Sequence, residues 1–268
     1  MAVITLTTDF GSADGYVGEV KGVLATRAPG AALIDVAHEV ASGDVRGAAW
    51  ILRRIWTRFP AGTIHLAIVD PGVGGERLPI VARSADRWFV GPDNGLMTVV
   101  DRVHTVREAR RILAEKGERP LSDTFHGRDV FAPAAAHLAA GKSPDEIGPP
   151  VEPSSLERLD IPEPERDGPL LRGHVLHIDR FGNLITTVPN DWLPEAAEVE
   201  IAGVRIPGVS ASYDAVEPGH LLLTRGSGGT LEISVRDGSA SERLGVHRDA
   251  EIVVRPAGPD SEQVGERR

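Results

Sequence analysis

The sequence predicts an N-terminal α/β domain with three layers and a mostly parallel sheet, followed by a smaller all-β barrel domain. In the first half, β-branched runs alternate with longer amphipathic segments, a pattern typical of strands connected by helices. After residue 170 only short apolar runs remain, separated by turn residues. A stretch rich in Pro and acidic residues lies between the halves, as expected of an exposed connector. We therefore expect the α/β domain at 1–150, the linker at 151–169, the barrel at 170–258 and a flexible tail at 259–268.

The elements of the first domain follow from residue type and period. Val, Ile and Thr favour strands, while apolar residues three and four apart favour helices. Residues 96–120 show no clear period. The expected strands are 2–8, 32–36, 63–69, 79–82 and 88–90, and the expected helices are 16–28, 45–59 and 133–140.

The second domain has short strands only. Their close spacing predicts a compact antiparallel barrel. The expected strands are 171–179, 184–188, 197–201, 204–206, 220–224, 230–235 and 251–255.

Composition excludes several classes of protein. No apolar run approaches the roughly 20 residues of a membrane span, and no leader precedes the first strand, so we expect a cytoplasmic protein. The absence of Cys excludes disulfides and thiolate chemistry. The net charge of -10 argues against a general nucleic-acid binder. The common phosphate-cradle motifs GxGxxG and GxxxxGK[ST] are missing from the expected positions.

The stretch IVDPGVGGER is the first candidate site. An apolar strand delivers Asp70 into a turn rich in Pro and Gly, and Arg77 follows. Gly lets another group approach the backbone closely, so the turn is suited to a ligand. A tight turn with solvated charges is the alternative interpretation.

Two further polar clusters accompany expected strand or helix ends. Asp9 follows the first strand, where open α/β sheets bind ligands, although it is also placed to cap the next helix. In TFHGRDVFA, His126 lies beside Arg128 and Asp129 at the start of an Ala-rich helix. A structural histidine is the alternative there.

The second domain carries a similar cluster in IDRFGN. Asp179 is suited to an ammonium group, Phe181 to stacking on a flat ring, and Asn183 to reading an adenine edge. A simple hairpin turn explains the same residues. The loops at 225–229 and 238–240 add weaker candidates for backbone contacts.

Taken together, the motifs resemble the S-adenosyl-L-methionine (SAM) hydrolases that form adenosine, also called SAM hydroxide adenosyltransferases, which are related to the fluorinase and chlorinase. They span nearly the whole chain: TTDFG at 7–11, VDPGVGGER at 69–77, VGPDNG at 90–95, TFHGRDVFAP at 124–133, IDRFGN at 178–183, GGTLEI at 228–233 and GSA at 238–240.

The resemblance implies a homotrimer with sites at subunit interfaces and SAM as substrate, without a cofactor or metal. It implies that Asp9 binds the ribose, and that the second domain binds methionine and adenine. The implied catalytic residues are Asp70, Arg77 and His126, and the implied contacts in the second domain are Asp179, Phe181, Asn183, Ser227 and Ala240.

Three positions favour water over halide as the nucleophile. The halogenating relatives carry a Tyr in place of Asp70, the fluorinase carries a Ser in place of Gly127, and Val73 replaces a Thr. A charged Asp70 beside the reactive carbon repels a halide ion.

The expected reaction is in-line attack of water on C5′ of SAM. Methionine leaves as a neutral thioether, so no general acid is needed. We expect Asp70 to accept a proton or hydrogen bond from water, Arg77 to hold Asp70, and His126 to relay the proton. The alternatives are a chlorinase-like halogenase, a non-catalytic SAM or adenosine binder, and a metal-dependent phosphoesterase using Asp9, Asp70, His126 and Asp129.

Overall fold

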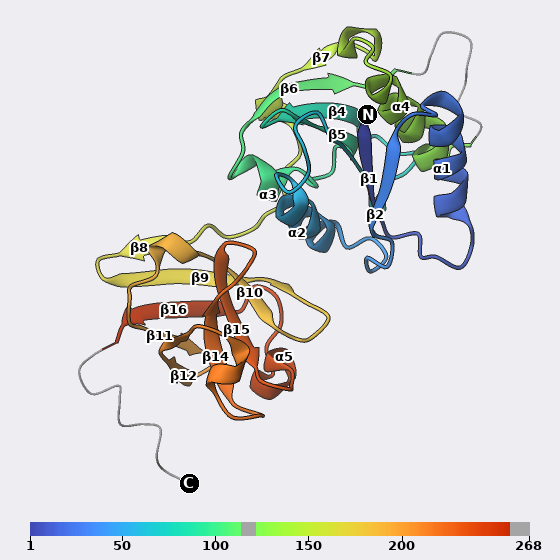
Figure 1. The fold of residues 1–268 in the computed structure, drawn as a ribbon. Helices are drawn as coiled ribbons and strands as arrows, with labels where there is room; N and C mark the ends of the chain where they lie inside the picture. The colour runs from blue at the N-terminus through green and yellow to red at the C-terminus, as the bar shows by residue number, and fades with distance from the viewer. Residues whose placement is uncertain (114–121, 258–268) are drawn as a thin grey trace. The chain divides into compact units, whose positions relative to one another are not determined.

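The computed structural model describes residues 1–113 and 122–257, and it divides into two compact units, Met1–Leu159 and Asp160–Arg268 (Figure 1). The division falls inside the expected linker, and the expected tail at 259–268 lies outside the described residues.

The first unit contains a seven-stranded sheet with the order β2-β1-β3-β5-β4-β6-β7. The four strands from β2 to β5 pair in parallel, whereas β5-β4, β4-β6 and β6-β7 pair antiparallel. The sheet is therefore mixed. The prediction of a mostly parallel sheet was wrong for the half that contains β4, β6 and β7. The strands are β1 Val3–Thr8, β2 Ala32–Ala37, β3 Ile64–Ile68, β4 Pro79–Ser84, β5 Arg87–Pro92, β6 Val106–Arg111 and β7 Pro150–Val151.

A tight hairpin explains the change of direction. Ala85 and Asp86 connect β4 directly to β5, and both have positive φ, 43° and 59°. Positive φ at both central residues matches the twist of a two-residue hairpin, which forces antiparallel pairing. Neither residue is Gly, so the usual sequence signal for this turn is weak.

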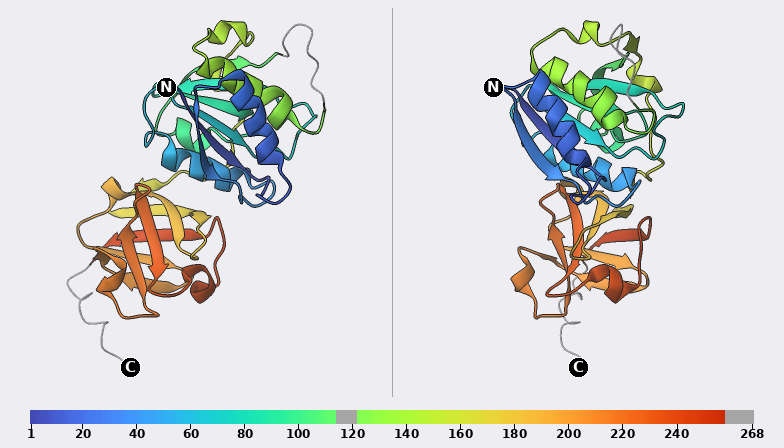
Figure 2. Two further views of the ribbon diagram at one scale, coloured as in Figure 1. Left: turned by 45° about the vertical axis from the view of Figure 1, so that its right-hand side comes forward. Right: turned by 90° about the vertical axis from the view of Figure 1, so that its right-hand side faces the viewer.

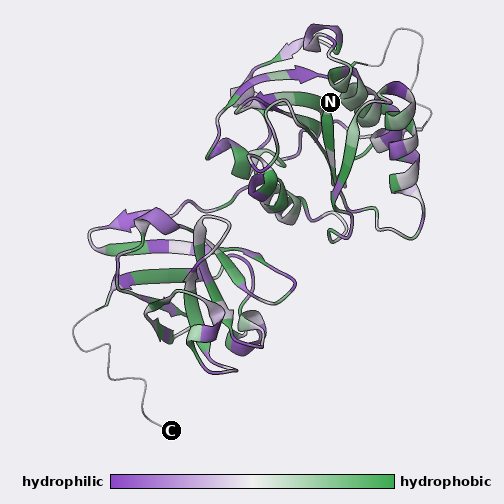
Figure 3. Cartoon of the chain, viewed as in Figure 1, coloured by the Kyte–Doolittle hydropathy of each residue, from purple (hydrophilic) through white to green (hydrophobic). Residues whose placement is uncertain are grey.

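Helices cover both faces of this sheet (Figure 2). Helices α1 (Tyr16–Arg27) and α4 (Ala132–Ala139) pack together over one core, which Ile64, Leu66 and Ile68 of β3 enter. Helices α2 (Val45–Ile55) and α3 (Thr98–Asp101) cover the other core, which receives Ala67. Because successive side chains of β3 point to opposite faces of the sheet, this strand contributes apolar residues to both cores. The central strands are correspondingly hydrophobic (Figure 3).

Strand β3 also carries a buried histidine, His65, which has no exposed surface. Its Nε2 donates to the Trp56 carbonyl oxygen at 3.2 Å, so its Nδ1 accepts from the Thr5 hydroxyl at 2.8 Å. Burial lowers the pKa of His65 to about 4, more than offsetting the hydrogen bond to the Trp56 carbonyl. The imidazole is therefore neutral in the folded chain at pH 7.

This histidine should make the fold sensitive to acid. Between about pH 6.5 and about pH 4, the unfolded chain binds a proton at His65 that the folded chain does not. The stabilisation is complete above that window and is lost as pH falls, by at most about 1.4 kcal/mol per pH unit. Urea unfolding of the wild type and His65→Gln across this window should show a shallower pH dependence for the variant. Parallel pH dependences would contradict the assignment.

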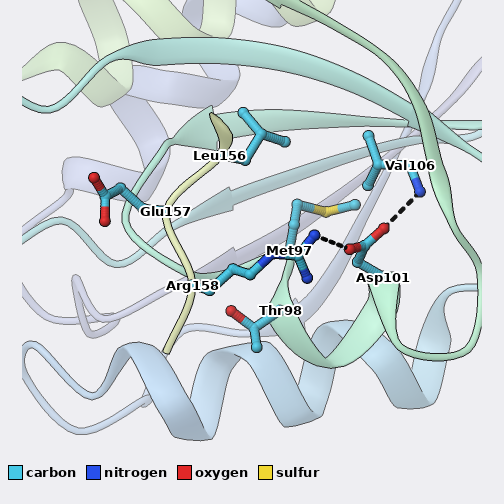
Figure 4. A pocket seen from close by; sticks show the side chains of 7 residues that line it. All are labelled: Met97, Thr98, Asp101, Val106, Leu156, Glu157 and Arg158. Atoms are coloured by element: carbon cyan, nitrogen blue, oxygen red, sulfur yellow. Dashed lines mark hydrogen bonds and ion pairs between the residues drawn. The ribbon is translucent and has the colours of Figure 1, made fainter. Parts of the chain in front are cut away.

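The segment Leu156 to Leu159 is fixed to the first unit rather than free. Arg158 Nη2 pairs with Asp101 Oδ2 at 2.5 Å (Figure 4). The backbone amide of Leu159 donates to Thr98 Oγ1 at 2.9 Å. The expected linker begins at residue 151, whereas the first compact unit extends to Leu159. These hydrogen bonds explain why the unit extends to Leu159.

The second unit is built around one barrel-like, nine-stranded sheet with the order β12-β11-β16-β9-β10-β15-β14-β13, and β8 pairs with β9. Strand β12 contacts β14, which brings the two ends of the sheet together. The expected short strands are confirmed, while β8 and β13 were not predicted. The strands are β8 Glu165–Asp167, β9 Leu170–Ile178, β10 Leu184–Pro189, β11 Ala197–Ile201, β12 Val204–Pro207, β13 Val209–Ser210, β14 Leu221–Arg225, β15 Thr230–Val235 and β16 Glu251–Pro256.

Side chains from alternate positions of these strands fill the second core, including Val175, Leu184, Leu231 and Val254. One short helix, α5 (Ala240–Leu244), follows β15 and packs against it. Across the described parts of both units, no helix has the length and apolar character required to cross a bilayer.

Candidate active site

Three turns of the first unit meet because their strands are parallel neighbours. Strands β1, β3 and β5 lie side by side, so the residues after their carboxyl ends gather at one edge of the sheet. These are the turns that begin at Asp9, Asp70 and Asp93. The predicted candidates Asp9 and Asp70 thus lie at the same edge.

At this edge, Asp70 and Arg77 form a buried pair. Arg77 Nε donates to both carboxylate oxygens of Asp70 at 3.0 Å, and Nη2 donates to Oδ2 at 2.5 Å. The Asp70 side chain is 6% exposed and that of Arg77 10%, so water screens this pair poorly. The alternative of solvated charges on a tight turn is therefore excluded.

His126 joins this pair through the same guanidinium. Arg77 Nη2 lies 2.7 Å from His126 Nδ1, and because a guanidinium can only donate, Nδ1 accepts. The proton of the neutral imidazole is then on Nε2. Arg77 also lies over the ring of Phe131, with 5.4 Å between Cζ and the ring centroid. The structure brings together all three predicted catalytic residues.

A π-helical turn, η1 (Gly127–Phe131), begins directly after His126 and continues into α4. Pro133 has no backbone N–H, so it cannot extend the α-helical bonding back into this turn. Turns of this kind often occur at functional sites. The sequence predicted the helix but gave no sign of the wider turn that positions His126.

The electrostatic environment favours neutral His126. Burial lowers its pKa, and the charge of Arg77 lowers it further. The carboxylates of Asp70, Asp123 and Asp129 oppose this shift without reversing it. His126 therefore presents an Nε2 hydrogen at neutral pH.

Close backbone contacts hold the loops of the site together. Gly74 has φ +76°, and a Cβ built on it would lie 2.6 Å from the carbonyl oxygen of Asp123. Only Gly permits this contact between the loop of Arg77 and the loop of His126. The Asn94 side chain donates from Nδ2 to the carbonyl oxygen of Val69 at 2.9 Å, which fixes the backbone just before Asp70. In the sequence, Asn94 stood out only as part of the VGPDNG motif at 90–95.

Aromatic rings surround Gly127. A Cβ there would lie 3.1 Å from the Phe10 ring and 3.2 Å from the Phe125 ring. These two rings meet edge to face with 5.7 Å between centroids, and Tyr16 contacts both. The rings were not predicted as part of the site, because Phe in a turn has no distinctive spacing.

Asp9 binds the backbone of a neighbouring loop. Its Oδ2 accepts from the Gly43 amide at 2.9 Å. Helix α1 begins at Tyr16 with Gly15 as its N-cap, so the alternative role of Asp9 as a helix cap is excluded.

In the second unit, Asp179 organises its own turn. Its Oδ1 accepts from the backbone amides of Phe181 and Asn183, and its Oδ2 accepts from Asn183 Nδ2 at 3.0 Å. Phe181 is 68% exposed, whereas Asn183 is buried. The turn packs on the start of α5, where the Ser241 amide donates to the Gly182 carbonyl. Asp179, Phe181, Asn183 and Ala240 are therefore neighbours.

Ser227 lies in the turn between β14 and β15, beside a polar cluster that sequence reasoning missed. The buried carboxylate of Glu232 accepts from the hydroxyls of Tyr213 and Ser234, and a Cβ on Gly226 would approach Glu232. Burial, the bond to Glu232 and the charges of Glu232 and Asp179 raise the pKa of Tyr213 to about 12. The charge of Asp179 thus acts on this cluster.

Two of the three carboxylates considered for a metal site, Asp70 and Asp129, already have cationic partners. Asp70 receives Arg77, and Asp129 receives Arg128 at 2.7 Å and 2.9 Å. Within residues 1–113 and 122–257, no three His, Cys, Asp or Glu side chains form a metal-binding group. Guanidinium groups at these carboxylates would repel a divalent ion, so the donor set does not fit one.

Fold and site together define a two-domain protein in which one arginine joins a carboxylate to a neutral imidazole at the edge of an α/β sheet. Comparison with protein families identifies the family. Residues 4–148 match the N-terminal domain of SAM hydroxide adenosyltransferases, and residues 173–253 match the C-terminal domain. The chain belongs to this family.

Individual relatives agree with the assignment. An (R)-S-adenosyl-L-methionine hydrolase of Thermus thermophilus is 44% identical over 92% of this chain and 96% of its own length. A fluorinase of Actinoplanes sp. is 28% identical over 72% of this chain and 74% of its own. The crystal structure of an uncharacterized conserved protein from Thermotoga maritima superimposes with a TM-score of 0.86 at 36% identity, covering 94% of this chain and 99% of that one.

Proposed function

We propose that this protein hydrolyses S-adenosyl-L-methionine to adenosine and L-methionine, and that it prefers the R configuration named for its relatives. The identity to a SAM hydrolase over nearly the whole chain carries the proposal. An acid in place of the Tyr of the halogenating relatives supports water as the nucleophile.

The chemistry assigns a task to each of three side chains. The sulfonium makes C5′ electrophilic, and water must be held in line opposite sulfur. Positioning of this kind contributes up to about 7–11 kcal/mol. As the C5′–O bond forms and the C5′–S bond breaks, the attacking water passes its proton to the Asp70 carboxylate, which later releases it to solvent, and the paired hydrogen bonds from Arg77 orient that carboxylate.

His126 differs from the relay first expected. Its Nδ1 is occupied by Arg77, so accepting a proton there would break that hydrogen bond. In this proposal it instead fixes the guanidinium and presents Nε2–H to the site. No metal or cofactor takes part.

The deciding experiment separates the sulfonium diastereomers of SAM and incubates each with the purified protein. Chromatography should detect adenosine and methionine in equal amounts, with faster turnover of the R form. Reactions with added chloride test for a 5′-chloro product, and reactions with EDTA test for a metal. A halogenated product, or loss of activity to EDTA with rescue by a divalent ion, would favour the alternatives; binding without turnover would leave a SAM-binding protein.

The pH dependence of activity should report His126. Protonation would turn Nδ1 into a donor facing Arg77, so activity should be lost as pH falls through the lowered pKa of His126. The acid limb of kcat/KM is expected below the ordinary value of about 6.5. His126→Asn keeps an acceptor oxygen without a titrating group, so its acid limb should disappear. An unchanged acid limb in this variant would contradict the assignment.

The proposal includes a cytoplasmic homotrimer whose sites combine residues of neighbouring subunits. The proposed catalytic triad of Asp70, Arg77 and His126 lies in the first unit. The proposed methionine and adenine contacts lie in the second. In mixed oligomers, Asp70→Asn and Asn183→Ala subunits should complement each other if sites are shared, whereas sites within one subunit would remain inactive. Light scattering of the purified protein measures the number of subunits.

A further inference from the structure

The turn that carries Asp9 is attached to the loop after β2 by several hydrogen bonds. The Gly11 amide donates to the His38 carbonyl at 2.8 Å, and the Gly43 amide donates to Asp9 Oδ2 at 2.9 Å. The Ser12 hydroxyl donates to the Glu39 carboxylate at 2.8 Å. The conformation of the Asp9 turn therefore depends on residues 38–43.

A series of side-chain hydrogen bonds runs from this turn through His38 to Asp35 and Lys21. The His38 Nδ1 lies 2.9 Å from Thr8 Oγ1, and Nε2 lies 3.0 Å from Asp35 Oδ1. Asp35 also receives the Lys21 ammonium at 2.6 Å. The Thr8 hydroxyl oxygen in turn accepts from the Phe10 amide at 3.4 Å.

Each hydrogen bond in this series can have one donor and one acceptor. In the tautomer whose Nε2 donates to Asp35, Nδ1 accepts from the Thr8 hydroxyl. The same hydroxyl oxygen remains able to accept from the Phe10 amide. His38 thus contacts both sides of Asp9: residue 8 through its ring, and residue 11 through its carbonyl.

A hydrolytic Thr–His–Asp triad is a different interpretation of the same side chains. Thr8 is only 1% exposed, so its hydroxyl is inaccessible to a substrate as a nucleophile. The His38 side chain is 13% exposed, which also places it behind the surface of the site. The arrangement is suited to holding a turn in place.

We propose that His38 is a positioning residue for the substrate, acting through Thr8 and Gly11 to orient the Asp9 carboxylate toward the ribose hydroxyls. This rests on the proposed function and on the ribose contact that the family resemblance implies for Asp9. Asp35 orients the ring of His38, and Lys21 neutralises Asp35. The loop after β2 therefore helps to hold the Asp9 turn in the conformation that binds substrate.

The test compares SAM with its 2′,3′-dideoxy analogue, which lacks the hydroxyls that Asp9 would bind. His38→Ala should lower the preference in kcat/KM for SAM over the analogue roughly tenfold, the effect of about one hydrogen bond to a charged group. Turnover of the analogue itself should change little. Thr8→Val removes the hydrogen bond between residue 8 and His38 with little change of side-chain shape, so it should lower the preference for SAM to a similar extent. This second variant keeps the test valid if His38→Ala folds poorly.

Two comparisons make the result specific. His137→Ala removes another histidine of the same unit, one that donates to the Ser143 carbonyl, and should leave the preference unchanged. In an Asp9→Asn background, His38→Ala should add no further loss. If His38→Ala slows SAM and the analogue equally, or its effect is fully additive to Asp9→Asn, the positioning role is overturned. If Asp9→Asn alone keeps the full preference, the ribose role of Asp9 fails, and the inference fails with it.

Discussion

Replacing Asp70 by Asn is expected to lower kcat by about 10²–10⁴-fold, the usual contribution of general-base assistance. The substitution preserves size but removes the negative charge that attracts the proton of the attacking water. Arg77 would still find an amide oxygen to donate to, so the turn should keep its shape. Affinity for SAM should therefore change little, because the effect falls on the transition state.

Single-turnover formation of adenosine measures the chemical step, and calorimetry with a SAM analogue that lacks the sulfonium measures binding. Asp145→Asn is a matched control, since Asp145 also pairs with an arginine, Arg110, but is 72% exposed. A kcat for Asp70→Asn within tenfold of the wild type would remove Asp70 from the proposed mechanism.

Replacing Arg77 by Met should abolish activity and also destabilise the fold. The substitution leaves the Asp70 carboxylate, only 6% exposed, without its cation. Breaking a buried ion pair in this way typically costs about 3–5 kcal/mol. His126 loses the donor to its Nδ1 at the same time, so two members of the triad lose their orientation.

The double variant Asp70→Asn/Arg77→Met separates the two effects. With the buried charge removed, much of the lost stability should return, while activity stays absent. Urea unfolding of the wild type and the three variants measures the coupling between the side chains. If Arg77→Met unfolds at the same urea concentration as the wild type, the pair contributes to orientation only.

Local features of the sequence predicted much of the site. Asp70 and Arg77 are seven residues apart, and the Pro and Gly residues between them indicate a turn that lets both side chains meet. His126 is 49 residues from Arg77, and its approach depends on Gly74 packing against Asp123. No spacing rule contains that contact, so the triad followed from the family resemblance rather than from pattern.

Features that depend on packing were the ones missed. The hairpin at Ala85 and Asp86 makes half of the sheet antiparallel, although neither residue carries the Gly signal of such a turn. Asn94 reaches the carbonyl of Val69 only because β3 and β5 are neighbours in the sheet. His38 was overlooked for a similar reason: its partner Thr8 is adjacent through sheet pairing and distant in sequence.

The packing of Gly127 restricts how this enzyme could evolve toward another nucleophile. Any side chain at this position, including the serine of the fluorinase, would press against the rings of Phe10 and Phe125, which would have to yield by a few tenths of an ångström. Gain of a hydroxyl here is therefore coupled to a change at a position more than a hundred residues away. A route from hydrolysis to halogenation that places a hydroxyl at Gly127 would therefore also displace the Phe10 and Phe125 rings at the edge of the site.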